Sequence, residues 1–205
     1  MKISLAQARF TKSAAALQDF PTESRAEIAF CGRSNAGKSS AINALCRQAN
    51  LARISKTPGR TQLINFFKLQ SDSHLVDLPG YGYAKAAAKV QKQWQRLVEN
   101  YLVDRGPLCG LVLVMDIRHP LTEMDWTMIR WTEQYNRPLY FLLTKVDKLN
   151  RNDTAKTLSK VTSDLEKRGF NSGIQVFSAT KKIGITQAEE KISAWLSQAL
   201  EHVSK

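Results

Sequence analysis

The sequence has few cysteines, few histidines and no long apolar stretch, and each shortage narrows what the protein can be. The three cysteines (Cys31, Cys46 and Cys109) are odd in number and form no C-x-x-C pair, so we predict free thiols rather than disulfides or a zinc site. None of the three histidines belongs to a Ser-His-Asp or metal-ligand pattern. No apolar stretch approaches the roughly 20 residues needed to cross a bilayer, and the first residues lack the apolar core of a signal peptide. We therefore expect a cytoplasmic protein with no membrane partner.

Acidic residues are also scarce relative to basic ones. The chain has 30 Lys and Arg residues against 18 Asp and Glu residues, a net charge of +12 at pH 7 and a pI of about 9.8. Such an excess favours a polyanionic partner such as RNA, DNA or an anionic membrane surface, and net charge alone does not choose among them. The imbalance is greatest between Arg47 and Arg96, where the acidic residues are Asp72 and Asp77. The basic residues of this stretch are Arg47, Arg53, Lys56, Arg60, Lys68, Lys85, Lys89, Lys92 and Arg96.

The chain of 205 residues is 43% hydrophobic and has no repeat, which favours one well-buried domain. We expect an N-terminal arm over residues 1–26 and the domain over residues 27–205. Short apolar runs predict strands at Ile28–Cys31, Leu63–Leu69, His74–Leu78, Leu111–Met115, Leu139–Leu143 and Ile174–Phe177. Most are separated by segments long enough for helices, near residues 39–48, 86–103, 121–135, 153–168 and 186–203.

Alternating strands and helices predict a mostly parallel sheet with helices on both faces. Only Gln70–Ser73 separates the second strand from the third, which is too short for a crossover helix and suits an antiparallel hairpin. We therefore predict an α/β fold of three layers, with a mixed six-stranded sheet and one antiparallel edge strand.

A phosphate-binding motif follows the first of these strands. The segment Gly32-Arg33-Ser34-Asn35-Ala36-Gly37-Lys38-Ser39, followed by Ser40, fits G-x-x-x-x-G-K-[ST]. In this P-loop, backbone N–H groups surround the phosphates, the lysine reaches the outer phosphates and the serine hydroxyl can bind Mg²⁺. The alternative is a Gly-containing turn that binds nothing, but the strand before it and the helix after it favour a nucleoside triphosphate site in a P-loop NTPase fold.

Two segments downstream match the nucleotide-sensing parts of such a site. Asp77-Leu78-Pro79-Gly80 ends the third strand, where the carboxylate can hold Mg²⁺ through water and the Gly80 N–H can contact a terminal phosphate. Between it and the P-loop lies a polar loop that can close over the nucleotide, with Thr61 on the metal and Thr57 as an open alternative. Its candidate binding residues are Gly59, Arg60, Thr61, Gln62 and Leu63. A flexible surface loop is the other interpretation of this segment.

Two further segments predict that the base is guanine. In Thr144-Lys145-Val146-Asp147 the carboxylate can accept hydrogen bonds from N1–H and N2–H₂ of guanine, which adenine does not offer. Because a threonine hydroxyl is not a carboxamide, specificity rests on Asp147, and contacts of residue 144 to the base and the P-loop are left open. In Phe177-Ser178-Ala179 the Ala179 N–H can meet guanine O6. The sequence therefore favours a GTPase over an ATP-dependent kinase.

These motifs, in this order, resemble the small GTPase domain of the translation-factor-related class, and more closely the EngB family of bacterial GTP-binding proteins. The resemblance rests on G-R-S-N-A-G-K-S-S, T-P-G-R-T-Q-L, D-L-P-G-Y-G-Y-A, D-I-R-H-P, T-K-x-D and S-A-T-K-K-I-G, and covers roughly residues 20–200. It implies GTP and GDP as ligands, Mg²⁺ as cofactor and a role in late assembly of the large ribosomal subunit. It also implies a requirement for normal growth, division and septation.

Hydrolysis of GTP is expected to be slow. Tyr81 follows Gly80 where Ras-type enzymes place a glutamine that orients the attacking water. Asn35 lies at the P-loop position where related GTPases can hold K⁺, although it could instead only tie the switch to the P-loop by hydrogen bonds. The candidate catalytic residues are thus Asn35, Lys38, Thr61 and Gly80, with Ser39 and Thr61 as the candidate Mg²⁺ ligands. The alternative function is a nucleotide-gated RNA- or ribosome-binding module with negligible hydrolysis.

A stripe of positive charge begins five residues after Gly80. Lys85, Lys89, Lys92 and Arg96 share one face of the predicted helix, while Val90, Trp94, Leu97 and Tyr101 share another. The stripe could be an ordinary solvated helix face. Next to a nucleotide sensor in a basic protein, it predicts contact with the large ribosomal subunit or its RNA. We expect no DNA partner, and we expect a monomer.

Overall fold

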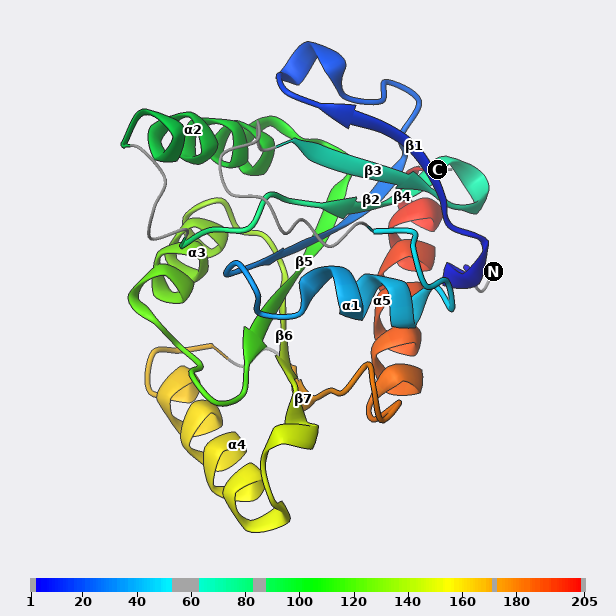
Figure 1. Cartoon of the computed structure of the whole chain (residues 1–205). Helices are drawn as coiled ribbons and strands as arrows, with labels where there is room; N and C mark the ends of the chain where they lie inside the picture. Colours follow the sequence, from blue (N-terminus) through cyan, green and yellow to red (C-terminus); the bar gives the residue numbers. More distant parts are fainter. Residues whose placement is uncertain (1–2, 53–62, 83–87, 171–172, 204–205) are drawn as a thin grey trace.

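A mixed sheet runs through the computed structural model, which describes residues 3–52, 63–82, 88–170 and 173–203 (Figure 1). Within these residues the sheet has seven strands in the order β1-β3-β4-β2-β5-β6-β7. They are β1 (Arg9–Ala14), β2 (Ala26–Gly32), β3 (Ile64–Lys68), β4 (Ser73–Asp77), β5 (Leu108–Asp116), β6 (Leu139–Thr144) and β7 (Ile174–Val176). Strands β4, β2, β5, β6 and β7 pair in parallel, whereas β3 is antiparallel to both β1 and β4.

Helices cover both faces of this sheet (Figure 1). In the described part of the chain the α-helices are α1 (Lys38–Leu45), α2 (Ala88–Asp104), α3 (Glu123–Gln134), α4 (Arg151–Glu166) and α5 (Ile185–Val203). Short 3-10 turns are η1 (Leu5–Gln7), η2 (Leu17–Asp19), η3 (Gln70–Asp72) and η4 (Val146–Lys148). Helices α1 and α5 pack on one face, and α2, α3 and α4 pack on the other. The predicted three-layer α/β fold is thus confirmed, with the hairpin between β3 and β4.

The predicted count of six strands is wrong by one. Residues Arg9–Ala14, expected to belong to a loosely structured arm, form β1 and extend the antiparallel edge of the sheet beyond β3. Most of this strand is exposed, including Phe10 at 56%, so it lacks the apolar run by which the other strands are recognised. Its pairing depends on the backbone of β3, a partner that is distant in sequence.

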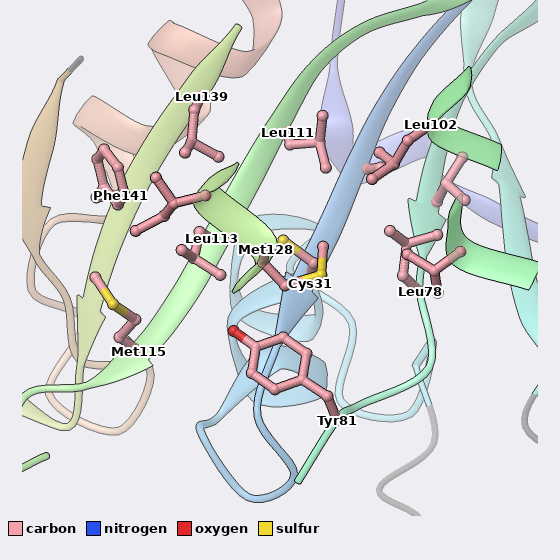
Figure 2. Packing of buried hydrophobic residues seen from close by; sticks show 14 of the residues in the cluster. Cys31, Leu78, Tyr81, Leu102, Leu111, Leu113, Met115, Met128, Leu139 and Phe141 are labelled. Carbon is pink, nitrogen blue, oxygen red and sulfur yellow. The ribbon is translucent and has the colours of Figure 1, made fainter. Parts of the chain in front are cut away.

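The core consists of two clusters, one on each face of the sheet. Side chains alternate along the strands, so that Leu111 and Leu113 of β5 join one cluster while Val112 and Val114 join the other. Figure 2 shows the first cluster, in which side chains of several strands and of α3 meet. The parallel strands are therefore buried on both faces, and their carboxyl ends share one edge of the sheet.

The cysteines are free, as predicted. Burial raises the pKa of the Cys31 thiol and of the Cys46 thiol to about 12 and that of Cys109 to about 11, so all three stay protonated at neutral pH. Among the described residues, none of the helices combines the length and the apolar character that crossing a membrane requires.

Candidate nucleotide-binding site

The phosphate loop connects β2, in the middle of the sheet, to the first turn of α1. Strand β2 ends at Gly32, and α1 begins at Lys38 with Gly37 as its N-cap. Gly37 has a φ of 99°, in the left-handed region, and a Cβ there would lie 3.3 Å from Thr144 Oγ1. Ser39 and Ser40 lie in the first turn of α1, where backbone N–H groups and the helix dipole favour an anion. The segment thus has the strand, glycine-containing loop and helix start on which the prediction of a phosphate loop rests.

A buried ion pair joins this loop to the end of β4. Lys38 Nζ donates to Asp77 Oδ1, and the two side chains are only 11% and 8% exposed. Asp77 is the last residue of β4 and lies opposite Phe30 of β2 in the parallel register. The two charges compensate each other in a poorly solvated place.

The backbone of Gly80 lies against the phosphate loop. A Cβ on Gly80 would lie 3.4 Å from both Cα and N of Ser34. The next residue, Tyr81, donates its N–H to the Gly32 carbonyl at 3.3 Å and accepts from the Ser34 N–H at 2.7 Å. Leu78, which is buried, donates its N–H to the Phe30 carbonyl at 3.0 Å. Backbone hydrogen bonds to β2 and to the loop after it thus hold the segment 77–80 beside the phosphate loop.

The two segments predicted to bind guanine are joined by hydrogen bonds. The Ser178 hydroxyl donates to Asp147 Oδ1 at 2.6 Å, and this bond is the main reason that the pKa of Asp147 is lowered. The Asp147 carboxyl is therefore ionised at neutral pH. The Val146 N–H donates to the Phe177 carbonyl at 3.2 Å, which keeps the two loops together. Ala179, half-buried, follows directly.

Thr144 and Lys145 connect the loop predicted to bind guanine to the phosphate loop. The Thr144 hydroxyl contacts the Ala36 carbonyl and lies 3.0 Å from the Met115 carbonyl. Lys145 Nζ donates to the Asn35 carbonyl at 2.6 Å. The sequence left open whether a threonine could reach the phosphate loop, and the structure shows that its hydroxyl does.

Asp116, at the end of β5, was not among the predicted site residues. Its Oδ2 lies 2.9 Å from Lys145 Nζ and 2.7 Å from Arg118 Nη2. Burial opposes ionisation, but the hydrogen bonds from Arg118 and Lys145 outweigh it and hold the pKa of Asp116 well below its usual range. The segment D-I-R-H-P, named above only as part of the EngB resemblance, thus supports the lysine of T-K-x-D through Asp116. One signal in the sequence could have indicated that Asp116 belongs to the site. It directly follows a predicted parallel strand, and in the structure it is in register with Thr144.

Part of the predicted site lies outside the described residues. This part comprises Thr57, Gly59, Arg60, Thr61 and Gln62, together with Lys85 of the basic stripe. Leu63, half-buried, directly precedes β3. The roles assigned to these residues stay predictions.

The oxygen donors near the phosphate loop suit Mg²⁺. The described residues contain no group of three or more His, Cys, Asp or Glu side chains that could hold a metal ion by themselves. Mg²⁺ at nucleotide sites needs only one or two protein oxygens, because phosphate oxygens and water complete its shell. The Ser39 hydroxyl at the start of α1 and the Asp77 carboxylate at the end of β4 provide such donors.

Three features together are typical of a P-loop GTPase. They are a phosphate loop after a central parallel strand, an aspartate at the end of the neighbouring strand and an aspartate in the loop predicted to bind guanine. Comparison with known proteins agrees with this class. The family described as 50S ribosome-binding GTPase matches residues 27–145. The probable GTP-binding protein EngB of Aromatoleum aromaticum is 54% identical over 92% of this chain and 88% of that protein. The protein of the same name from Thiobacillus denitrificans is 51% identical, over 94% of this chain and 93% of its own length.

The chain belongs to the EngB family of GTP-binding proteins, and GTPases of this fold generally use Mg²⁺. Solved structures agree in fold. A probable GTP-binding protein engB superposes with a TM-score of 0.65 at 22% identity, covering 84% of this chain and all of that one. Era in complex with MgGDPNP and nucleotides of 16S ribosomal RNA superposes with a TM-score of 0.64 at 16% identity, over 83% of this chain and 56% of Era.

Proposed function

We propose that this protein is a GTP-gated switch with slow intrinsic hydrolysis, which acts in the cytoplasm in assembly of the large ribosomal subunit and is needed for normal cell division and septation. The ribosomal role is supported by the description of the matching family, 50S ribosome-binding GTPase, and by the net charge of +12. The slow rate is supported by one observation above all, the burial of Tyr81, which is only 2% exposed. The roles in division and septation are inferred from the EngB resemblance.

In this proposal, residues at or near several strand ends divide the tasks of the nucleotide site among them. Ser39 and Thr61 would hold Mg²⁺, with Asp77 in its outer shell, and the ion would supply positive charge against the phosphate oxygens. Lys38 would reach the outer phosphates, and the Gly80 N–H would contact the terminal one. Asp147 and the Ala179 N–H would read guanine. Binding of GTP would order the segments around Thr61 and Gly80, and hydrolysis would release them.

The direction in which Tyr81 points supports slow hydrolysis. Its hydroxyl donates to Asp125 Oδ1 inside the core at 2.6 Å, so this side chain does not stand where a water-orienting glutamine would. Asn35, exposed in the phosphate loop with a φ of 64°, is the proposed K⁺ ligand. Replacing Na⁺ by K⁺ at equal ionic strength should raise GTP turnover by about tenfold or more, because a site that binds K⁺ but not the smaller Na⁺ would hold a positive charge at the developing negative charge only in the potassium salt. Equal rates in the two salts would remove K⁺ from the mechanism.

The alternative is a binding module whose hydrolysis is negligible, which the inward orientation of Tyr81 also favours. Single-turnover decay of GTP separates the two functions. Decay that is measurable alone, or that large-subunit particles accelerate, supports the switch. No decay in either salt, with or without particles, supports the module.

The proposed ribosome-binding surface includes the basic face of α2. Lys92 and Arg96 are exposed, whereas Leu97 packs against the core and Tyr101 is fully buried. The described part of α2 therefore turns its apolar side inward and its cations outward, as the sequence predicted for this helix. Lys85 and the side chain of Lys89 lie outside the described residues.

Charge reversal tests this surface. The double variant Lys92→Glu/Arg96→Glu should co-sediment more weakly with large-subunit particles in the GTP-analogue state, and its log–log salt slope should fall by about one unit per lost phosphate contact. The matched control is Lys156→Glu/Lys160→Glu, which makes the same change of charge on exposed positions of α4. Equal losses in the two double variants would mean that total charge, not this face, drives binding.

A further inference from the structure

Tyr81 contacts both the phosphate loop and the core, and its position next to Gly80 makes those contacts relevant to nucleotide sensing. Its backbone N–H and carbonyl bind Gly32 and Ser34 of the phosphate loop, as described above. Its ring lies in the core cluster on the face covered by α2, α3 and α4, and Figure 2 shows it in the same layer as Cys31 and Met128. Tyr81 thus joins the phosphate loop to the interior of the domain.

Tyr81 also joins a buried polar network at the start of α3. Asp125 is 2% exposed, and its Oδ1 accepts the Tyr81 hydroxyl at 2.6 Å. Its Oδ2 accepts from both the N–H and the hydroxyl of Thr122, each at 2.8 Å, in the capping box of α3. A buried carboxylate is tolerated only when hydrogen-bond donors satisfy its oxygens. Removal of the tyrosine hydroxyl therefore leaves the buried Oδ1 without this donor.

Burial, followed by the charge of Asp125, raises the pKa of Tyr81 well above its usual value. The hydroxyl is therefore protonated at any physiological pH and can donate. The Tyr81 hydroxyl can therefore donate to Asp125, which links the residue after Gly80 to the first turn of α3.

We propose that Tyr81 is a positioning residue for recognition of the terminal phosphate, and that its bond to Asp125 anchors the Gly80 backbone against Ser34 so that α3 responds to the nucleotide state. The inference rests on the proposed contact of the Gly80 N–H with the terminal phosphate. Because GDP lacks that phosphate, the anchor contributes to binding of GTP and not to binding of GDP. A residue that only stabilised the fold would change the two affinities together.

The test compares Kd values for Mg-GDP and for a non-hydrolysable Mg-GTP analogue. Tyr81→Phe should weaken binding of the analogue by about five- to tenfold, the effect of one lost hydrogen bond, while GDP binding changes by less than about twofold. The matched control is Thr132→Val in the same helix. Its buried hydroxyl donates to the Ile129 carbonyl at 2.7 Å, so the substitution also removes one buried hydroxyl from α3 but leaves Tyr81 untouched. Thr132→Val should not change the ratio of the two affinities.

Two further measurements keep the proposal testable if Tyr81→Phe folds poorly. Asp125→Ala leaves the Tyr81 hydroxyl without its partner and should reduce the same affinity ratio, and the double variant should be no worse than the stronger single one, because both substitutions remove the same bond. In the unmodified protein, amide hydrogen exchange over residues 121–126 should be slower with the GTP analogue than with GDP.

The possible outcomes separate this inference from the proposed function. If the unmodified protein binds neither nucleotide, the proposed function fails. If it binds both and Tyr81→Phe lowers the two affinities equally, the proposed positioning role of Tyr81 is overturned. The same holds if Thr132→Val changes the affinity ratio as much as Tyr81→Phe does. Exchange over residues 121–126 that is the same with both nucleotides would also contradict it.

Discussion

Asp147→Asn is expected to weaken binding of GDP and GTP by about a hundredfold to ten-thousandfold. The carboxylate would accept two hydrogen bonds from guanine, and hydrogen bonds to charged groups contribute about 1.5–3 kcal/mol each. Asp147 is ionised at neutral pH, and the Ser178 hydroxyl lowers its pKa further, so the full charge is available. An asparagine replaces this charge with a carboxamide that presents N–H donors toward the donors of guanine.

The same substitution should create a preference for xanthine nucleotides. The Ser178 hydroxyl, which donates to Oδ1 in the unmodified protein, should keep the carboxamide oxygen on its side and leave the nitrogen on the other. That nitrogen can donate to the C2 carbonyl that xanthine has in place of the guanine amino group. Calorimetric titration with GDP and xanthosine diphosphate measures both effects.

Asp164→Asn is the matched control for charge, because it makes the same change within α4, in a helix next to the site but outside it. Its GDP affinity should equal that of the unmodified protein. If Asp147→Asn bound GDP as tightly as this control, Asp147 would not read the base.

Arg105→Ala is expected to destabilise the fold by about 3–5 kcal/mol, because it leaves a buried carboxylate without its cation. Glu27, at the start of β2, is completely buried, and Arg105 Nε lies 3.0 and 2.9 Å from its two carboxylate oxygens. The Tyr101 hydroxyl donates to the same carboxylate at 2.8 Å, and Arg105 Nη2 also donates to the Pro21 carbonyl at 2.7 Å. The network therefore joins the end of α2 to the central strand and to the chain before it.

Thermal unfolding measures this effect. For a protein of this size the midpoint should fall by roughly 6–20 °C. The control is Lys68→Ala, which breaks the exposed ion pair with Asp72, whose side chains are 43% and 47% exposed. It should change the midpoint little, because water and salt screen exposed charges. Similar midpoints for the two variants would show that the buried pair contributes no more than a surface one.

Local patterns were sufficient to predict most of the fold. Strands β2 and β5 contain continuous apolar runs, at Ile28–Cys31 and Leu111–Met115, because both of their faces are buried, and such runs are visible without any knowledge of their neighbours. The P-loop was recognisable for a related reason. Glycines and a lysine at fixed spacing meet the demands of a phosphate on one short stretch of backbone.

Strand β1 and the polar contacts between distant elements could not be predicted in this way. The pairing of β1 depends on the edge that β3 offers, since its own side chains are mostly exposed. The bond between Tyr81 and Asp125 spans 44 residues, and the approach of Lys145 to Asn35 spans 110. The sequence around either residue of such a pair does not indicate which distant residue it contacts.

The sequence by itself determined the class of fold, the phosphate loop and the preference for guanine, because each depends on residues that are neighbours along the chain. Tertiary structure alone decided that Tyr81 faces the core, that Asp116 supports Lys145 and that Glu27 is neutralised by Arg105. These relations arise when strand ends and helix termini are brought to one edge of a sheet, where buried charges and hydroxyls must find partners.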